Sequence, residues 1–449
     1  MPGPEPRIRI EADYQLKNTG NQPLNELELR LPGRRRFRYE QPLALWDSTV
    51  LTLGNSTDNP RNTLMHFAEP WVKTARHTLH LSVEYLPATA GGTTLSFSND
   101  AFFLPAEGWS PELLPARGLF AKGGVPPKQW NLQVQTPQEF LVHTSGKAKI
   151  SRSGGELVLR IAQGANDRYP FVIAGRYSSA EMRGGKQKIF LWTRKPQDTA
   201  GLHELSDALS RTIAAYDSVF GTRTKEPSAT WIVECPMAAG CFTNLNPLTG
   251  ELLGEGEEEP ISAEMISPDT MMVDLRGGAP KLAAAAAPSL AASWLGYAQN
   301  PGFYEQDPPL SLLPAFAASI GREAAEGGDS RSETIRRVLR LIPERAEAHG
   351  EKDQAILRAK SFLFFYALQD RWGREVFRKA IHHMLEARTK RGLELSDLIA
   401  AFDQETHENT AEFVRRWMKQ QGVPDDFRKR YGDAAAATDT GKAQKEIAP

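Results

Sequence analysis

The stretch that decides the fold reads Pro288-Ser289-Leu290-Ala291-Ala292-Ser293-Trp294-Leu295-Gly296, and alanines fill 283–287 before it. The small apolar side chains favour a helix, in a window of about 281–298, that packs closely against its neighbours. A proline in a helix interior costs about 3 kcal/mol, whereas the first helical position accepts it. We therefore predict that a helix begins or bends at Pro288, and we favour a start there.

The composition is that of an ordinary globular protein. The chain of 449 residues is long enough for two or three domains, and its net charge of −1 disfavours nucleic-acid binding. No apolar run is long enough to span a bilayer, and residues 1–9 do not form a signal peptide. The two cysteines, Cys235 and Cys241, are too few for a disulfide framework or a cysteine zinc site, although their spacing allows one bridge.

The chain divides into a strand-rich part and a largely helical part. Residues 1–187 are expected to form a β-sandwich or saddle, because short alternating runs lie between turns at 7–15, 24–31, 76–85, 130–134, 156–161 and 171–177. Residues 188–433 are expected to form an α/β and helical domain, with strands at 188–194, 229–233 and 271–275. Its helices are predicted at 203–220, 281–298, 310–325, 330–348, 352–371, 373–389, 395–404 and 409–421. Residues 434–449 are alanine-rich and polar, which predicts a disordered tail.

Several short segments, taken in order, resemble the membrane alanyl aminopeptidase family of gluzincin zinc peptidases. They are Phe103-Leu104-Pro105, Gly108-Trp109-Ser110-Pro111, the hairpin 140–147, the strand 170–177, Lys360-Ser361-Phe362-Leu363, Ser396-Asp397-Leu398 and the stretch 413–417. The resemblance implies a thermolysin-like α/β plus helical domain after the β-sandwich. It also implies that the family's additional C-terminal helical domain is missing.

The family's zinc helix corresponds to 288–296 and reads H-E-L-A-H-Q-W-F-G. In that motif, two histidines at i and i+4 hold zinc and the glutamate is the general base. The frame fits at Leu290, Ala291, Trp294 and Gly296, but Pro288, Ser289 and Ala292 occupy the chemical positions. None of these side chains offers an imidazole or a carboxylate.

The family's other chemical positions are also replaced. Pro314 stands where the resemblance places the third ligand, a glutamate, with a spacing three residues longer than the family's. The substrate-amine motif G-A-M-E-N corresponds to Gly240-Cys241-Phe242-Thr243-Asn244, in which Thr243 replaces the glutamate. Arg358 occupies the position of the tyrosine that stabilises the oxyanion. The resemblance therefore implies a peptidase scaffold with no catalytic residues, no metal ligands and no zinc.

Two other sites deserve a hypothesis. His382 and Glu386 share one helix face at i,i+4, so they form either a surface ion pair, which we favour, or part of a metal site. The resemblance places Arg358 in the position of the family's substrate cleft, called the old cleft below. There it either binds a carboxylate or is neutralised by a neighbouring acid. The residues expected to line that cleft are Gly240, Thr243, Asn244, Ser289, Ala292, Pro314 and Arg358.

The resulting hypothesis is a soluble pseudopeptidase that binds a peptide or protein in the old cleft. Strand addition near Gly240 to Asn244 would serve this role, because it uses backbone groups alone. One alternative is an enzyme with relocated chemistry, and another is a structural module of an envelope or surface assembly. The Met1-Pro2 start and the Asn18-Thr19-Gly20 turn lead us to expect an exported protein whose leader is absent from this chain, with a cytoplasmic location as the alternative.

Overall fold

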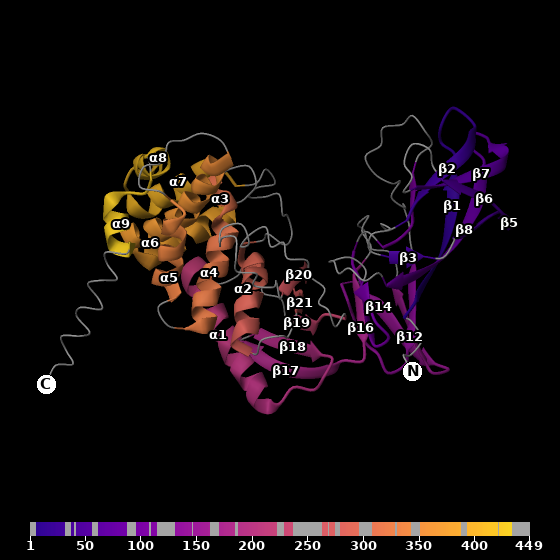
Figure 1. Cartoon of the computed structure of the whole chain (residues 1–449), viewed down its shortest axis with the longest axis horizontal. Helices are drawn as coiled ribbons and strands as arrows, with labels where there is room; N and C mark the ends of the chain where they lie inside the picture. The colour runs from indigo at the N-terminus through magenta and orange to yellow at the C-terminus, as the bar shows by residue number, and fades with distance from the viewer. Residues whose placement is uncertain are drawn as a thin grey trace. The chain divides into compact units, whose positions relative to one another are not determined.

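The computed structural model is a mixed α+β structure, strand-rich in its N-terminal part and helical in its C-terminal part (Figure 1). The fold-class prediction is confirmed at this level. The structure describes residues 6–31, 37–39, 42–55, 62–87, 96–106, 109–114, 131–145, 147–161, 170–184, 187–221, 229–236, 263–267, 269–273, 279–295, 308–327, 330–342, 351–387, 393–420 and 422–432. The expected tail at 434–449 lies outside these residues.

The chain forms two compact units. The first comprises Met1–Tyr177 and Cys235–Thr243, and the second comprises Ser178–Glu234 and Asn244–Pro449. The main division falls at Tyr177, whereas the sequence-based boundary was placed at 187. The difference arises because the strand Ser178–Gly184 pairs with the strand Gln187–Thr193, so both belong to one hairpin. The domain assignment otherwise stays a prediction.

Antiparallel sheets build the first unit. One sheet has the order β1-β8-β4-β5, with β3 also paired to β8, and its strands are β1 Ile8–Lys17, β3 Phe37–Tyr39, β4 Leu43–Trp46, β5 Thr49–Val50 and β8 Arg76–Pro87. A second has the order β11-β2-β7-β6, formed by β2 Leu24–Arg30, β6 Thr52–Asn55, β7 Asn62–Trp71 and β11 Glu112–Leu114. Both sheets contribute to one apolar core, in which Leu29, Met65 and Leu81 are fully buried.

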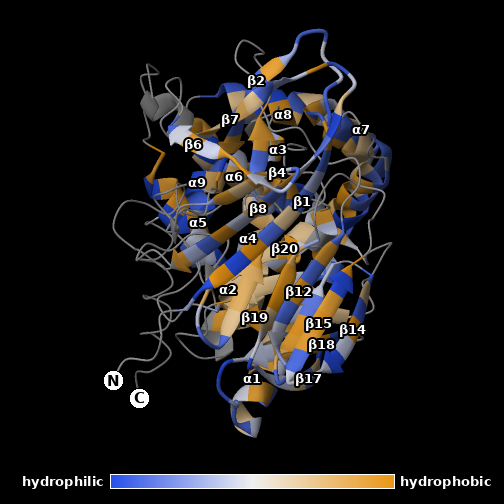
Figure 2. Cartoon of the chain, turned by 90° about the vertical axis from the view of Figure 1, so that its right-hand side faces the viewer, coloured by the Kyte–Doolittle hydropathy of each residue, from blue (hydrophilic) through white to orange (hydrophobic). Residues whose placement is uncertain are grey.

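Two smaller sheets complete the first unit. The order β13-β16-β10-β9 joins β9 Ser96–Phe97, β10 Ala101–Leu104, β13 Leu141–Thr144 and β16 Val172–Gly175. The order β12-β15-β14 joins β12 Leu132–Pro137, β14 Ala148–Ser153 and β15 Glu156–Ile161. Polar and apolar residues alternate over most of β12 (Figure 2), and burial alternates along both β12 and β15, which matches the period of a strand with one buried face.

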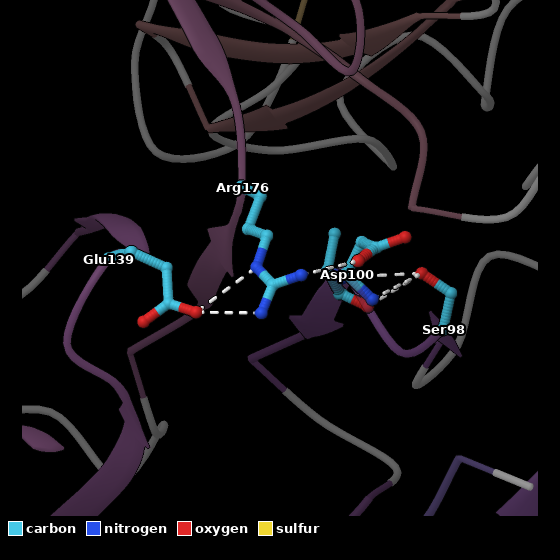
Figure 3. A network of polar contacts seen from close by, with 5 residues as sticks. Ser98, Asp100, Glu139 and Arg176 are labelled. Atoms are coloured by element: carbon cyan, nitrogen blue, oxygen red, sulfur yellow. Dashed lines mark hydrogen bonds and ion pairs between the residues drawn. The ribbon is translucent and has the colours of Figure 1, made fainter. Parts of the chain in front are cut away.

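Ion pairs of Arg176 fix the chain just after β16, close to the point where it leaves the first unit. The Arg176 guanidinium donates to Glu139 at 2.7 and 3.1 Å and to Asp100 at 3.4 Å (Figure 3). The pKa of Glu139 is lowered, first by its own backbone N–H and then by Arg176. Gly175 is required here for space, because a Cβ would lie 2.5 Å from Ala101 Cβ and 2.8 Å from Asp100 O.

The second unit contains a five-stranded sheet with helices packed against it. The strand order is β17-β18-β19-β21-β20, formed by β17 Ser178–Gly184, β18 Gln187–Thr193, β19 Ala229–Glu234, β20 Ala263–Ser267 and β21 Thr270–Val273. The pairs β18–β19 and β19–β21 are parallel, while both edge strands pair antiparallel. The helices are α1 Thr199–Phe220, α2 Ala279–Leu295, α3 Pro308–Ser311, α4 Leu313–Glu326, α5 Ser330–Arg340, α6 Glu351–Ala387, α7 Leu395–Thr406, α8 Thr410–Lys419 and α9 Asp425–Tyr431.

Close packing of α1, α2 and α4 forms the centre of the second unit. Tyr216 of α1 is fully buried, and its hydroxyl donates to the carbonyl oxygen of Ala287 on α2 at 2.7 Å. The position next to it on α4 is Gly321, where a Cβ would lie 2.6 Å from Tyr216 Cζ and 2.8 Å from Ala287 Cβ. Only a hydrogen atom fits at that point. Burial raises the pKa of Tyr216 far above its usual value, which keeps the phenol protonated as a donor.

We expect Gly321→Ala to destabilise the second unit by about 1–3 kcal/mol, because the added methyl overpacks a closed contact. Denaturant unfolding followed by circular dichroism measures the loss. Gly54→Ala is the control, since its Cβ would meet His66 at an ordinary 3.5 Å. Combining Gly321→Ala with Tyr216→Phe should cost less than the sum of the single changes, because the hydroxyl clashes with the new methyl. Strict additivity would contradict the contact.

Candidate functional site

The central helix α2 carries the first candidate positions. It begins at Ala279 and ends at Leu295, with Pro288 in its interior. The predicted start at Pro288 is therefore wrong. The proline is accommodated because helix packing stabilises α2 along its length: Ala283, Ala287 and Ala291 are fully buried. Contacts reach α2 from α1, α4, β20 and β21 (Figure 1).

The candidate positions Ser289, Ala292 and Pro314 are buried among these elements. Ser289 and Ala292 expose 6% and 7% of their surface. Pro314 is buried in the first turn of α4, where a proline is tolerated since the first N–H groups of a helix have no partner within it. Pro288 and Ala292 lie one turn apart on α2, and α4 packs against that helix. The convergence of Pro288, Ala292 and Pro314 at one point stays a prediction.

An edge strand lies beside α2. Strand β20 pairs with β21 on one side, and α2 packs against both strands. Within the described residues, β20 has no strand on its other side. Such an edge presents backbone N–H and C=O groups that a further extended chain can pair with.

The remaining candidates, Gly240, Thr243 and Asn244, follow a disulfide-bonded cysteine in the sequence. Cys235 is buried and disulfide-bonded, and Cys241 is the only other cysteine of the chain. Gly240, Thr243 and Asn244 lie outside the described residues. The predicted cleft-lining role of these three residues therefore stays a prediction.

Arg358 and its neighbour Lys360 lie on α6. Arg358 is half-buried, and its predicted role in a cleft stays a prediction. Lys360 is 5% exposed, and its ammonium donates to the carbonyl oxygens of Met418 and Gln420 at the end of α8. Burial lowers the pKa of Lys360. Trp417 Nε1 donates back to the carbonyl of Lys360 at 3.0 Å. This lysine joins α6 to α8 and so has a structural role.

A polar cluster between α4 and α6 was not found by sequence reasoning. Tyr366 is fully buried, donates to Glu323 Oε1 at 2.6 Å and lies 2.6 Å from Ser319 Oγ. The Arg331 guanidinium lies 5.0 Å from the Tyr366 ring centre and binds Asp370 at 2.9 Å. Burial and then the Glu323 carboxylate raise the pKa of Tyr366 well above its usual value. The Glu323 carboxylate thus accepts a hydrogen bond from a buried tyrosine. No motif spacing could have indicated this pairing.

The histidine pair on α6 makes separate ion pairs. His382 Nε2 lies 3.2 Å from Glu386 Oε1, and His383 Nδ1 lies 3.0 Å from Glu405 Oε1 on α7. These contacts agree with the favoured ion-pair interpretation. Among the described residues, no group of three or more His, Cys, Asp or Glu side chains has the arrangement of a metal site. None of the described helices is both long and apolar enough to cross a lipid bilayer.

Comparison with known proteins finds similarity among solved structures. No family model matches the sequence, and no curated protein matches it. The structure is similar to a variant of an M1 zinc metallopeptidase from Deinococcus radiodurans (TM-score 0.48, 14% identity, covering 94% of this chain and 92% of that chain). A variant of a two-domain M1 zinc metallopeptidase bound to L-tryptophan gives 0.46 and 15%, with 94% and 92% covered. The M1 zinc metallopeptidase of Deinococcus radiodurans itself gives 0.44 and 15%, with 94% and 91% covered.

The two prolines provide a matched test of the site's framework. Pro288→Ala should stabilise the protein by about 1–3 kcal/mol, because alanine restores an N–H to an interior helical turn. Pro314→Ala should change stability by only a few tenths of a kcal/mol, since its N–H would have no partner within the first turn. Thermal and denaturant unfolding measure both changes. Destabilisation by Pro288→Ala, as at a helix start, would contradict an uninterrupted α2.

Proposed function

We propose that this protein is a catalytically inactive, aminopeptidase-like protein that binds extended peptide segments of a partner. The observation that carries the proposal is the buried state of Ser289 and Ala292 on α2, a helix that contacts β20, whose outer edge has no partner strand among the described residues. Side chains that could do the family's chemistry are replaced on this helix. The backbone edge that could hold a peptide is present within the same unit.

The case against peptidase chemistry is chemical. A zinc peptidase needs a metal that lowers the pKa of its water to about 7, and a carboxylate that accepts the proton. Ser289 cannot act as that base, and as a nucleophile it would need an activating partner. Pro288, Ala292 and Pro314 offer no ligand atom in their side chains. These replacements support loss of the reaction centre as a whole.

The case for binding rests on the edge of β20. Main-chain hydrogen bonds supply affinity in strand addition, and alternate side chains of the added peptide meet the protein surface. The contact of α2 with β20 would place a bound peptide near that helix. A peptide held there would meet small side chains and no acid or base of the family's motif. Binding without turnover is the consistent outcome.

Metal content and turnover test the inactive state. We expect purified protein to contain well below stoichiometric zinc, and to release no product from aminoacyl chromogenic substrates with or without added zinc. Mass spectrometry of metals and absorbance assays measure these quantities, with an active zinc aminopeptidase as the positive control. Stoichiometric zinc together with turnover would overturn the proposal. Turnover without zinc would instead favour relocated chemistry.

Hydrogen exchange tests peptide binding separately. A pool of random-sequence decapeptides should slow amide exchange in Ala263–Ser267, since added ladder bonds protect backbone N–H groups. The internal control is β17, the opposite edge of the same sheet, whose exchange should not change. Equal protection of both edges, or no protection of β20 at saturating peptide, would contradict the proposed mode.

A further inference from the structure

The first unit has a long strand at the edge of its largest sheet. Strand β1 runs over Ile8–Lys17, 10 residues, and pairs along its whole length with β8. Within the described part of the chain, no strand pairs with its outer edge. Long exposed edges are normally avoided, because unpaired backbone groups template further pairing. A partner strand is the simplest reason for such an edge.

The apolar face of β1 is only partly covered. Its burial alternates between half-buried and exposed residues from end to end. The half-buried residues on this face, Ile8, Ile10, Tyr14 and Leu16, pack against the core of the unit. In the neighbouring strand β8, Leu79, Leu81, Val83 and Tyr85 are at most 1% exposed. A strand added beside β1 would therefore bury apolar surface that remains partly accessible.

The exposed face of β1 carries charges of both signs. Arg9 and Glu11 pair with each other at 2.9 Å and have side chains exposed by 64% and 54%, while Asp13 lies 2.8 Å from His80 and is 72% exposed. Arg7, just before the strand, pairs with Glu84 at 2.6 Å and is 53% exposed on its side chain. The sequence order along this face is thus basic, basic, acidic, acidic over Arg7, Arg9, Glu11 and Asp13.

This order is complementary to itself in an antiparallel arrangement. Pairing of two copies about a two-fold axis at Ile10 places Arg9 opposite the other copy's Glu11, and Arg7 opposite its Asp13. The exposed face of one strand must continue the exposed face of the other, so odd-numbered residues must lie opposite odd-numbered residues. A shift of the pairing by one residue would place exposed residues opposite half-buried ones. Other registers that keep the faces matched place like charges together. A two-fold axis at Ala12 places Glu11 opposite the other copy's Asp13, and an axis at Arg9 places the two Arg9 side chains opposite each other. The Ile10 register brings together the most opposite charges.

Another edge strand of this unit shows the contrast. Strand β14, at the edge of the sheet β12-β15-β14, carries Lys149 and Arg152 and no acidic residue. Two such strands repel each other, as expected for an edge that avoids pairing. The mixed pattern of β1 lacks this protection.

We propose that two copies of this chain associate through their β1 strands, antiparallel and with the two-fold axis at Ile10. The interface is isologous, so each charge pair occurs twice. Backbone hydrogen bonds between residues 8–12 of the two copies join the sheets, and the charge pairs fix the register. This association is independent of the peptide-binding role proposed for the second unit.

Charge reversal tests the register. Sedimentation velocity over a concentration series should show a dimer for the unmodified full-length chain. Arg9→Glu and Glu11→Arg should each weaken dimerisation by at least about tenfold, because opposite pairs become like pairs. The double variant Arg9→Glu/Glu11→Arg should regain the dimer. An equimolar mixture of the two single variants should form a heterodimer, since every opposed pair is then opposite in charge.

Lys149→Glu on β14 is the matched control and should leave dimerisation unchanged. Circular dichroism verifies that each variant is folded, and recovery on mixing the two single variants excludes loss of the intrachain Arg9–Glu11 pair as the cause of weakening. A monomer at every concentration would overturn the proposal. A dimer that is insensitive to both single reversals, or fails to recover on mixing, would also overturn it by placing the interface elsewhere.

Discussion

The hydrogen bond from Tyr216 to the carbonyl of Ala287 is the constraint on which the second unit depends. A buried phenol without an acceptor is costly, typically by about 1–3 kcal/mol, so the bond holds α1 and α2 at a fixed separation. The ring then occupies the space beside α4, where only Gly321 leaves room for it. Three helices thus meet at one point through a tyrosine, an alanine and a glycine. The size of each of these side chains is therefore constrained by the other two.

The same constraint accounts for the alanines of α2. Helices that approach closely need small side chains at the contact, and the run 283–287 supplies them. A catalytic zinc site needs three protein ligands and an open position for water. Ser289 and Ala292, nearly buried, are placed for packing. The small side chains at 289 and 292 and the tight packing of α2 are therefore consistent with one another.

Sequence periodicity predicted best the strands along which burial alternates and the helices with a long apolar stripe. The strands at 8–17, 24–30 and 156–161 lie close to their expected positions, because burial alternates along each of them. The expected break between 371 and 373 coincides with Gly373, whose φ of 80° is non-helical within α6. The predicted strands leave out β7, β17 and β20. β17 and β20 are edge strands, so their pairing partners, not their own pattern, define them.

The site was less predictable than the fold. Local propensity placed a helix start at Pro288, but contacts from α1, α4 and the sheet stabilise the helix through the proline. The Tyr366–Glu323 pair joins residues that are 43 apart in the chain, and no one-dimensional spacing encodes such a contact. Residue identity could show which chemistry is absent from 288, 289, 292 and 314. Only packing could show that Ser289, Ala292 and Pro314 are buried.

Among the sheet edges of the described residues, β1 and β20 carry different side chains, and these suit them to different partners. β1 carries ordered charges of both signs, so its best partner is a strand of fixed sequence in a fixed register. β20 has the sequence Ala263-Glu264-Met265-Ile266-Ser267, with one charge only, so its backbone groups dominate what it offers. Methionine adapts to varied surfaces because its side chain is flexible and polarisable. The β20 edge therefore suits the proposed capture of peptides of varied sequence, whereas the charged, self-complementary edge of β1 suits the proposed pairing with a second copy of the chain.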